Sequence, residues 1–264
     1  MSPPTTSLLL PADEPVYDLD LLRALRGTRL ARELRVLSVI GAHRFDELPL
    51  VDKLFPALRR IDLFEPQPEP LAALEALARR DPRLRVFPCA IADTDGTATF
   101  HVASNHGESS SLLELGSHKS LFPEVSMQTS IEVRTRRLDS VLAEHSLEPP
   151  DALIIDVQGA EYLVLSALPA ALLANVRLIY TEVSTEAVYA GARPLADVEA
   201  LLAPRFVNAG FAPINARVPV HGNAVFVARE DLAALVELPW RERTRRALHR
   251  WKRRRREARR SRDA

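Results

Sequence analysis

The stretch Leu153-Ile154-Ile155-Asp156-Val157-Gln158-Gly159-Ala160-Glu161 decides the fold class. An apolar run ends in a carboxylate, a tight turn follows, and an apolar-periodic segment then begins. This order is typical of a buried strand that delivers a polar group to the ligand edge of a doubly wound sheet and continues into a helix. A second stretch, Ile61-Asp62-Leu63-Phe64-Glu65-Pro66, has the same form. Two carboxylates at two strand ends predict one cleft that binds a polar ligand.

The composition is that of a globular protein. Of 264 residues, 47% are hydrophobic and 27% charged, which is enough to bury the core of one α/β domain. No apolar run is long enough to span a bilayer, and Ser7-Leu8-Leu9-Leu10 is too short for a signal peptide, so we expect a cytoplasmic protein. The single Cys89 excludes an internal disulfide and a cysteine-based zinc site. No pair of histidines has helical metal-ligand spacing, so we predict no structural metal.

A net charge of zero conceals an asymmetry. Residues 240–264 hold thirteen Lys or Arg against three Asp or Glu, so the remainder of the chain is acidic. Within this segment Ala247, Leu248 and Trp251 fall on one helical face. Such a basic amphipathic helix can bind an anionic membrane surface or nucleic acid. The alternative is a solvated extension that folds against the acidic body.

Strands and helices alternate along most of the chain, which predicts a parallel sheet covered by helices. The expected strands are 36–40, 60–64, 84–89, 152–156 and 176–182, and the expected helices are 18–26, 45–54, 69–79, 138–144 and 160–174. Strands at 97–102 and 131–135 flank the polar stretch 104–111, which we interpret as an insertion over one end of the sheet. A terminal antiparallel hairpin is expected from strands 211–216 and 224–228 with a turn at 219–222. We expect three parts, namely an arm with a short helix (1–34), a central domain (35–230) and a basic tail (231–264).

The turn after the first strand indicates a nucleoside ligand. Gly41 directly follows that strand, and Glu65 comes 24 residues later at the end of the next one. An acidic residue at about this spacing, roughly 20 residues on, accepts hydrogen bonds from ribose hydroxyls in nucleotide-binding sheets. A solvated carboxylate before a proline-capped helix is the alternative. The next glycine is Gly96, so the turn lacks the glycines that a dinucleotide pyrophosphate needs, and S-adenosylmethionine fits better than NAD or FAD.

Polar residues at the other strand ends are candidates for catalysis. Asp156 would face the reacting centre and orient or deprotonate a hydroxyl, or serve the helix dipole instead. Glu161 has the same two interpretations, and Glu182 is a third carboxylate at this edge. His43 and His221, the latter in the expected hairpin loop, are each either a general base or a solvated loop residue.

Several segments together resemble a known family. Ile155-Asp156-Val157-Gln158-Gly159-Ala160-Glu161 is similar to the Ile-Asp-Val-Glu/Gln-Gly-x-Glu signature of the FkbM-type methyltransferases. Further segments agree with that family in order and spacing, and the resemblance covers roughly residues 35–230. These segments are Phe64-Glu65-Pro66, Ala90-Ile91-Ala92-Asp93, Ser109-Ser110-Ser111-Leu112 and Arg137-Leu138-Asp139-Ser140-Val141-Leu142.

The resemblance implies a class I, Rossmann-like α/β fold. It also implies S-adenosylmethionine-dependent O-methylation of a hydroxyl on a sugar or polyketide-type small molecule. The residues that would hold the cofactor are Gly41, Ala42, His43, Glu65, Pro66, Ala90, Ile91 and Asp93. The catalytic candidates are Asp156 for orientation or as base, His221 as the alternative base, and Glu161.

The first motif departs from the family pattern. The family has Asp-x-Gly-Ala-Asn-x-Gly where this chain has Val39-Ile40-Gly41-Ala42-His43-Arg44-Phe45, without the acidic residue and the second glycine. This departure supports a second hypothesis, a non-catalytic, degenerate relative that binds a ligand or partner on the same fold. The retention of Glu65, Asp156 and Glu161 argues against that hypothesis.

Overall fold

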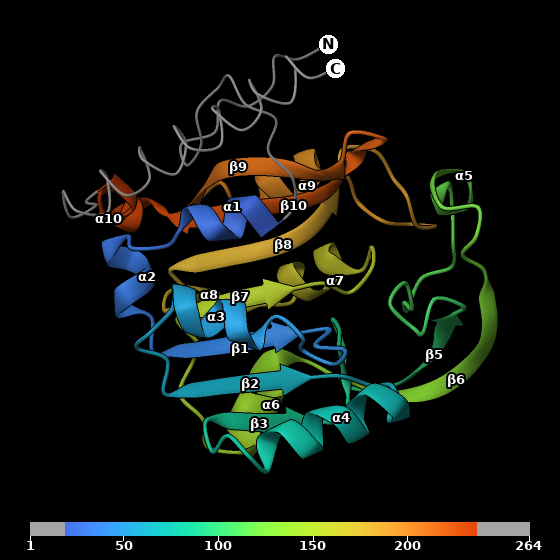
Figure 1. Cartoon of the computed structure of the whole chain (residues 1–264), viewed down its shortest axis with the longest axis horizontal. Coiled ribbons are helices and arrows are strands. Elements are labelled where there is room, and N and C mark those ends of the chain that lie inside the picture. Colours follow the sequence, from blue (N-terminus) through green and yellow to red (C-terminus); the bar gives the residue numbers. More distant parts are fainter. Residues whose placement is uncertain (1–18, 237–264) are drawn as a thin grey trace, which may run out of the picture.

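The computed structural model describes residues 19–236. The expected arm at 1–16 and the basic amphipathic helix of the tail therefore lie outside the described residues. The described chain forms an α/β fold with one large sheet and a smaller three-stranded sheet to its side (Figure 1). Within these residues, none of the helices is long and apolar enough to cross a membrane.

The large sheet has the predicted doubly wound topology with a terminal hairpin. Its order is β3-β2-β1-β7-β8-β10-β9, and β1 pairs in parallel with both β2 and β7, so the strand order reverses between β1 and β7 while the strands keep one direction. β10 is antiparallel to β8 and to β9. The strands are β1 (Val36–Ile40), β2 (Arg60–Phe64), β3 (Leu84–Phe87), β7 (Ala152–Ile155), β8 (Leu178–Ser184), β9 (Phe206–Asn215) and β10 (Val218–Ala228).

Helices cover both faces of this sheet, which explains why β1 and β2 are buried along their whole length. Leu37 and Val39 of β1 pack into one cluster, while Ile40 of the same strand packs into the other. The first cluster lies under α1 (Leu19–Ala24), α2 (Arg29–Glu33), α3 (Leu48–Leu54), α4 (Pro68–Ala78) and α10 (Leu232–Val236). The second lies under α6 (Leu138–Glu144), α7 (Glu161–Ser166), α8 (Ala170–Leu173) and α9 (Leu195–Leu202).

The expected insertion forms the smaller sheet. Its order is β4-β6-β5, with β5 antiparallel to β6. It lies beside the right-hand edge of the large sheet in Figure 1, where the parallel strands end. The elements are β4 (Ala90–Ile91), β5 (Gly96–Ala103), β6 (Met127–Arg136) and the short helix α5 (His118–Leu121).

Three expected elements differ in the structure. The single helix expected at 160–174 is divided into α7 and α8, because Pro169 lacks an amide hydrogen and stands where a new helix begins. The expected hairpin turn at 219–222 is wrong: the strands turn between Asn215 and Val218, where the Asn215 side chain accepts the amide hydrogens of Arg217 and Val218. α3 begins at Leu48, after a turn at 41–47, instead of at Phe45.

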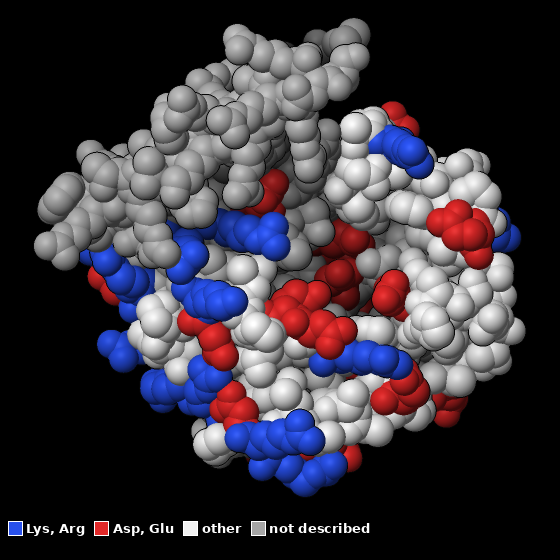
Figure 2. Space-filling view, in the orientation of Figure 1, with Lys and Arg blue, Asp and Glu red and all other residues white. Residues whose placement is uncertain are grey.

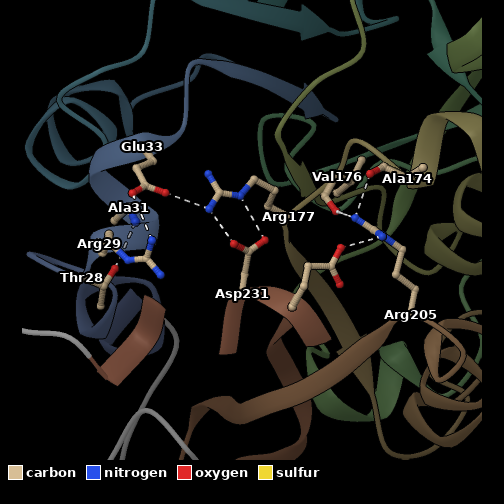
Figure 3. A network of polar contacts seen from close by, with 10 residues as sticks. Thr28, Arg29, Ala31, Glu33, Ala174, Val176, Arg177, Arg205 and Asp231 are labelled. Atoms are coloured by element: carbon tan, nitrogen blue, oxygen red, sulfur yellow. Dashed lines mark hydrogen bonds and ion pairs between the residues drawn. The ribbon is translucent and has the colours of Figure 1, made fainter. Parts of the chain in front are cut away.

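An arginine network joins distant segments at the amino ends of the strands (Figure 3). Arg177 donates from Nη2 to Glu33 of α2 (2.9 Å) and from Nε to Asp231 (3.0 Å). Asp231 belongs to the 3-10 turn η1 (Arg229–Asp231) after β10. Arg205 donates to the carbonyl of Ala174 (2.8 Å) close by. These contacts attach both ends of the described chain to the start of β8.

Candidate active site

A cleft of about 660 Å³ opens at the carboxyl ends of the parallel strands. We call it the switch-point cleft, because β1 and β7 meet at its floor and the strand order reverses there. Open α/β sheets bind their ligands at this place. The strand ends of β1, β2, β7 and β8 form one wall, and the insertion forms the other. Of the sequence-predicted site residues, those that line the cleft are Gly41, Ala42, His43, Glu65, Pro66, Ala90, Ile91, Asp156 and His221.

Gly41 lets the β1 turn lie directly against the end of β7. Its φ is +80°, and a Cβ atom there would stand 1.7 Å from the Asp156 carbonyl oxygen. Asp156 in turn donates its amide hydrogen to the Ile40 carbonyl (2.9 Å). A side chain at this position would force the two strand ends apart, so glycine is required both for conformation and for space.

The missing second glycine of the first motif has not removed the left-handed backbone. Phe45 stands at that position with φ +53°, and His43 has φ +44°. The left-handed conformation costs a non-glycine residue about 1 to 2 kcal/mol. Burial of the Phe45 ring, which is 4% exposed in the core, offsets this cost. The turn therefore keeps the left-handed backbone conformation at this position, although phenylalanine replaces the glycine.

Glu65 supports the same turn and still faces the cleft. It is 2% exposed, and its carboxylate accepts the amide hydrogens of His43 (2.8 Å) and Gln67 (2.8 Å). Burial raises the pKa of Glu65, and these hydrogen bonds oppose that rise. A carboxylate has about four lone-pair sites, of which the protein uses three through these amides and Gln67 Nε2. The free site fits a ribose hydroxyl.

The neighbouring wall is apolar and fits a purine ring. Ala90 and Ile91 are both buried and line the cleft beside Phe64. Asp93, expected near an adenine, is exposed and is not among the residues that line the cleft. The insertion loop closes this side, because Gln67 Nε2 donates to the Gly107 carbonyl (3.3 Å) and His43 Nε2 lies 3.1 Å from the carbonyl of His106.

Two strand-end carboxylates share one amide at the cleft floor. Gln158 Nε2 donates to Asp156 Oδ1 and to Glu182 Oε2, at 2.7 Å each. Tyr189 Oη holds the other end of that amide by donating to Gln158 Oε1 (2.5 Å). The Asp156 side chain is exposed to the cleft, but protein atoms surround the cleft floor on which it stands. This removal from bulk water, together with the charge of Glu182, keeps the pKa of Asp156 well above its ordinary value.

Glu161 lies behind the cleft and stabilises the turn between β7 and α7. Its Oε1 accepts the amide hydrogens of Val157 and Gly159, at 3.1 Å each, and its side chain is not among those that line the cleft. Burial and the charge of Glu182 raise the pKa of Glu161 to about 7. This placement matches the helix-start interpretation of Glu161.

The three carboxylates are close enough to raise the question of a metal ion. Oxygens of Asp156, Glu161 and Glu182 lie within 4.8 Å of one another. The Gln158 amide nitrogen, however, fills the space between Asp156 and Glu182, and a nitrogen that donates hydrogen bonds does not ligate a cation. The expectation of no structural metal stays a prediction.

His221 lies in strand β10 and not in the expected hairpin loop. It pairs with Ser184 of β8 and is 3% exposed. Its Nε2 lies 3.2 Å from Glu182 Oε1, and its Nδ1 lies 2.7 Å from Ser184 Oγ. Burial alone would favour the neutral ring, but the charge of Glu182 and their hydrogen bond raise the pKa of His221. The imidazole ring of His221 is therefore engaged by Glu182 and Ser184, which favours a positioning role over that of a general base.

Three residues of this site were not identified from the sequence. Gln158 and Tyr189 hold the carboxylates apart, and His118 of α5 packs between the rings of Phe122 and Tyr189 (centroids 4.8 and 5.1 Å) at the cleft wall. Gln158 stood inside the recognised motif, so its polarity was a usable signal. His118 comes from the short helix α5 and Tyr189 from the segment between β8 and α9, and only the folded chain brings them to the site.

Comparison with known proteins identifies the family. The family model for the methyltransferase FkbM domain matches residues 40–212, so the chain belongs to this family. The curated 2-O-methyltransferase NoeI of Sinorhizobium fredii is 35% identical over 151 residues. That match spans 54% of this chain and 62% of NoeI, which is less than two thirds of the relative's length.

Two solved structures match this chain at low identity and with TM-scores below 0.5. The methyltransferase FkbM of Methylobacillus flagellatus is 12% identical, with a TM-score of 0.47, over 79% of this chain and 50% of its own. Fibrillarin of Aeropyrum pernix, solved with S-adenosylmethionine, is also 12% identical, with a TM-score of 0.44, over 75% of this chain and 68% of its own.

Proposed function

We propose that this chain is an S-adenosylmethionine-dependent O-methyltransferase acting on a hydroxyl of a sugar or polyketide-type small molecule. Membership of the methyltransferase family supports this, as does the similarity to a relative named as a 2-O-methyltransferase. The observation that carries the proposal is that the Gly41 turn, Glu65 and Asp156 converge on one cleft at the reversal of strand order.

The residues present fit this cofactor. Glu65 would accept a ribose hydroxyl, Ala90 and Ile91 would contact the adenine, and the turn at Gly41, Ala42 and His43 would lie along the remainder, with Pro66 beside it. When bound, S-adenosylmethionine supplies an electrophilic methyl group on a sulfonium. The exposed Asp93 receives no role in this proposal.

Asp156 would orient the acceptor hydroxyl and take its proton. Its carboxylate faces the cleft, and the raised pKa brings it closer to neutral pH, where a general base works best. The Gln158 amide would hold that carboxylate in place, and Glu161 would hold the turn that carries it. His221 could act as base only after releasing Glu182, so we assign it to positioning.

One observation favours the non-catalytic alternative. Val39 replaces the acidic residue of the first motif, and its apolar side chain lines the cleft with 3% exposure. The carboxylate that the family pattern has at this position is thus absent from the cleft. Calorimetric measurement of cofactor binding distinguishes the methyltransferase function from the non-catalytic one.

The test is isothermal titration of the full chain with S-adenosylhomocysteine. We expect micromolar binding, weakened at least about tenfold in Glu65→Ala, because that variant removes both the ribose contact and the acceptor of the His43 amide. Glu75→Ala, an exposed carboxylate on α4, is the matched control and should bind like the wild type. Absence of binding by the folded wild-type protein would contradict the proposal and support the non-catalytic function.

A further inference from the structure

The wall of the switch-point cleft carries a large excess of negative charge. Figure 2 shows acidic side chains gathered in the hollow at the middle of this face. The acidic residues that line the cleft are Asp46, Glu47, Glu65, Glu108, Glu124, Asp156 and Glu182. Among the described lining residues, Arg44 alone is a lysine or arginine, and it forms an ion pair with Glu69 of α4.

Part of this charge is balanced by the protein. The amides of His43 and Gln67 bind Glu65, and the ring of His221 accompanies Glu182. Asp156 has no cationic partner among the described residues, and its raised pKa is caused in part by Glu182 and other carboxylates nearby. S-adenosylmethionine has a net charge of only about +1, so most of the excess remains when the cofactor is bound.

The unbalanced charge extends onto the wall formed by the insertion. Glu108 and Glu124 are exposed at the cleft there, and Phe122, which also lines the cleft, has its ring 6.3 Å from that of His221. Carboxylates beside an aromatic face are the usual surroundings of an ammonium group. Burial and the charge of His221 lower the pKa of His118, so its ring adds no positive charge. Its buried Nδ1 has no hydrogen-bond partner among the described residues.

From this distribution we infer that the methyl acceptor is cationic: a hydroxylated compound with an amine, of the aminosugar or aminocyclitol class. The inference rests on the proposed function and deepens it. An acceptor with phosphate, sulfate or carboxylate groups would meet like charges, because Arg44 and His221, the cationic groups among the described lining residues, are already paired with Glu69 and Glu182. A metal ion is a poorer occupant, because the Gln158 amide fills the space between Asp156 and Glu182.

The experiment compares three probes that share one ring and differ in charge. The full-length protein is saturated with S-adenosylhomocysteine and titrated calorimetrically with methyl glucosaminide, methyl glucoside and methyl glucuronide. The amine should bind at least about tenfold more tightly than the neutral sugar, and the carboxylate most weakly. The preference should shrink when the salt concentration rises from about 0.02 M to about 0.5 M, because salt screens the exposed carboxylates.

Two variants test whether the carboxylates of the cleft wall cause the preference for the amine. Glu124→Gln should reduce the preference for the amine at least about threefold, whereas Glu75→Gln on α4 should leave it unchanged. Equal affinity for amine and neutral sugar, or no detectable binding of the amine to protein that binds S-adenosylhomocysteine, would overturn the inference. Failure to bind S-adenosylhomocysteine would instead count against the proposed function.

Discussion

At the scale of single residues, three carboxylates at one sheet edge have two different tasks. Glu65 and Glu161 each accept two backbone amide hydrogens and so hold turns in place. Among the described residues, Asp156 accepts a hydrogen bond from the Gln158 side chain alone, and it faces the open cleft. The carboxylate group thus supports the backbone at two positions and is available for chemistry at the third, and the hydrogen-bond partners make the difference.

The buried Glu161 makes stability depend on pH. Its pKa rises from 4.5 to about 7 in the folded chain, so the folded state binds the proton more tightly than the unfolded state. The free energy of unfolding should therefore fall as pH rises through this window. Glu161→Gln keeps an oxygen for the two amides but cannot ionise. Its stability relative to wild type should increase by up to roughly 3 kcal/mol between pH 4.5 and pH 8. Urea unfolding measures this, and parallel curves for the two proteins would refute the explanation.

At the scale of elements, the closest approach in the site is that of the β1 turn to the end of β7. Gly41 and Gly191 both have φ +80°, but an added Cβ would meet the Asp156 carbonyl at Gly41 and nothing within 4 Å at Gly191. Gly191→Ala should cost only the left-handed strain, about 1 kcal/mol. Gly41→Ala should cost at least about 2 kcal/mol more and weaken binding of S-adenosylhomocysteine. Urea midpoints give both values, and equal losses would show that the strand ends are not in tight contact.

The large sheet and its covering helices also show which elements local patterns can predict. The helix at 138–144 has the expected bounds, because its apolar residues recur at helical spacing and face one cluster. α9 was not expected, although Leu195, Val198 and Leu202 follow the same spacing after Pro194. The pattern was therefore present there, in a helix one residue longer than α6, and could have been predicted.

At the scale of the whole molecule, the arginine network joins the two ends of the described chain away from the cleft. Arg177 is 25% exposed and its partner Asp231 is 11% exposed, so loss of the guanidinium would leave a largely buried carboxylate unpaired. Arg177→Gln should destabilise the fold by about 2 kcal/mol. Arg23→Gln, in an exposed pair with Asp20, should change stability by less than about 0.5 kcal/mol.

The same variant separates stability from binding. Arg177 lies at the amino end of β8, whereas the cleft lies at the carboxyl ends of the strands. Below the unfolding transition, Arg177→Gln should bind S-adenosylhomocysteine as the wild type does. A large loss of affinity in folded protein would mean that the two ends of the sheet are coupled.

The sequence by itself determined the doubly wound sheet and the placement of Glu65 and Asp156 at one edge. Those features depend on local periodicity and on a carboxylate at the end of each apolar run, and both can be recognised within a few residues. The tertiary structure decided the position of His221 in β10, because strand register depends on pairing with Ser184, 37 positions away. It likewise decided the contact between Gln158 and Tyr189, and the acidic wall of the cleft. Contacts between segments far apart in the chain leave no periodic signal, so the chemistry of the site emerged only when the chain was folded.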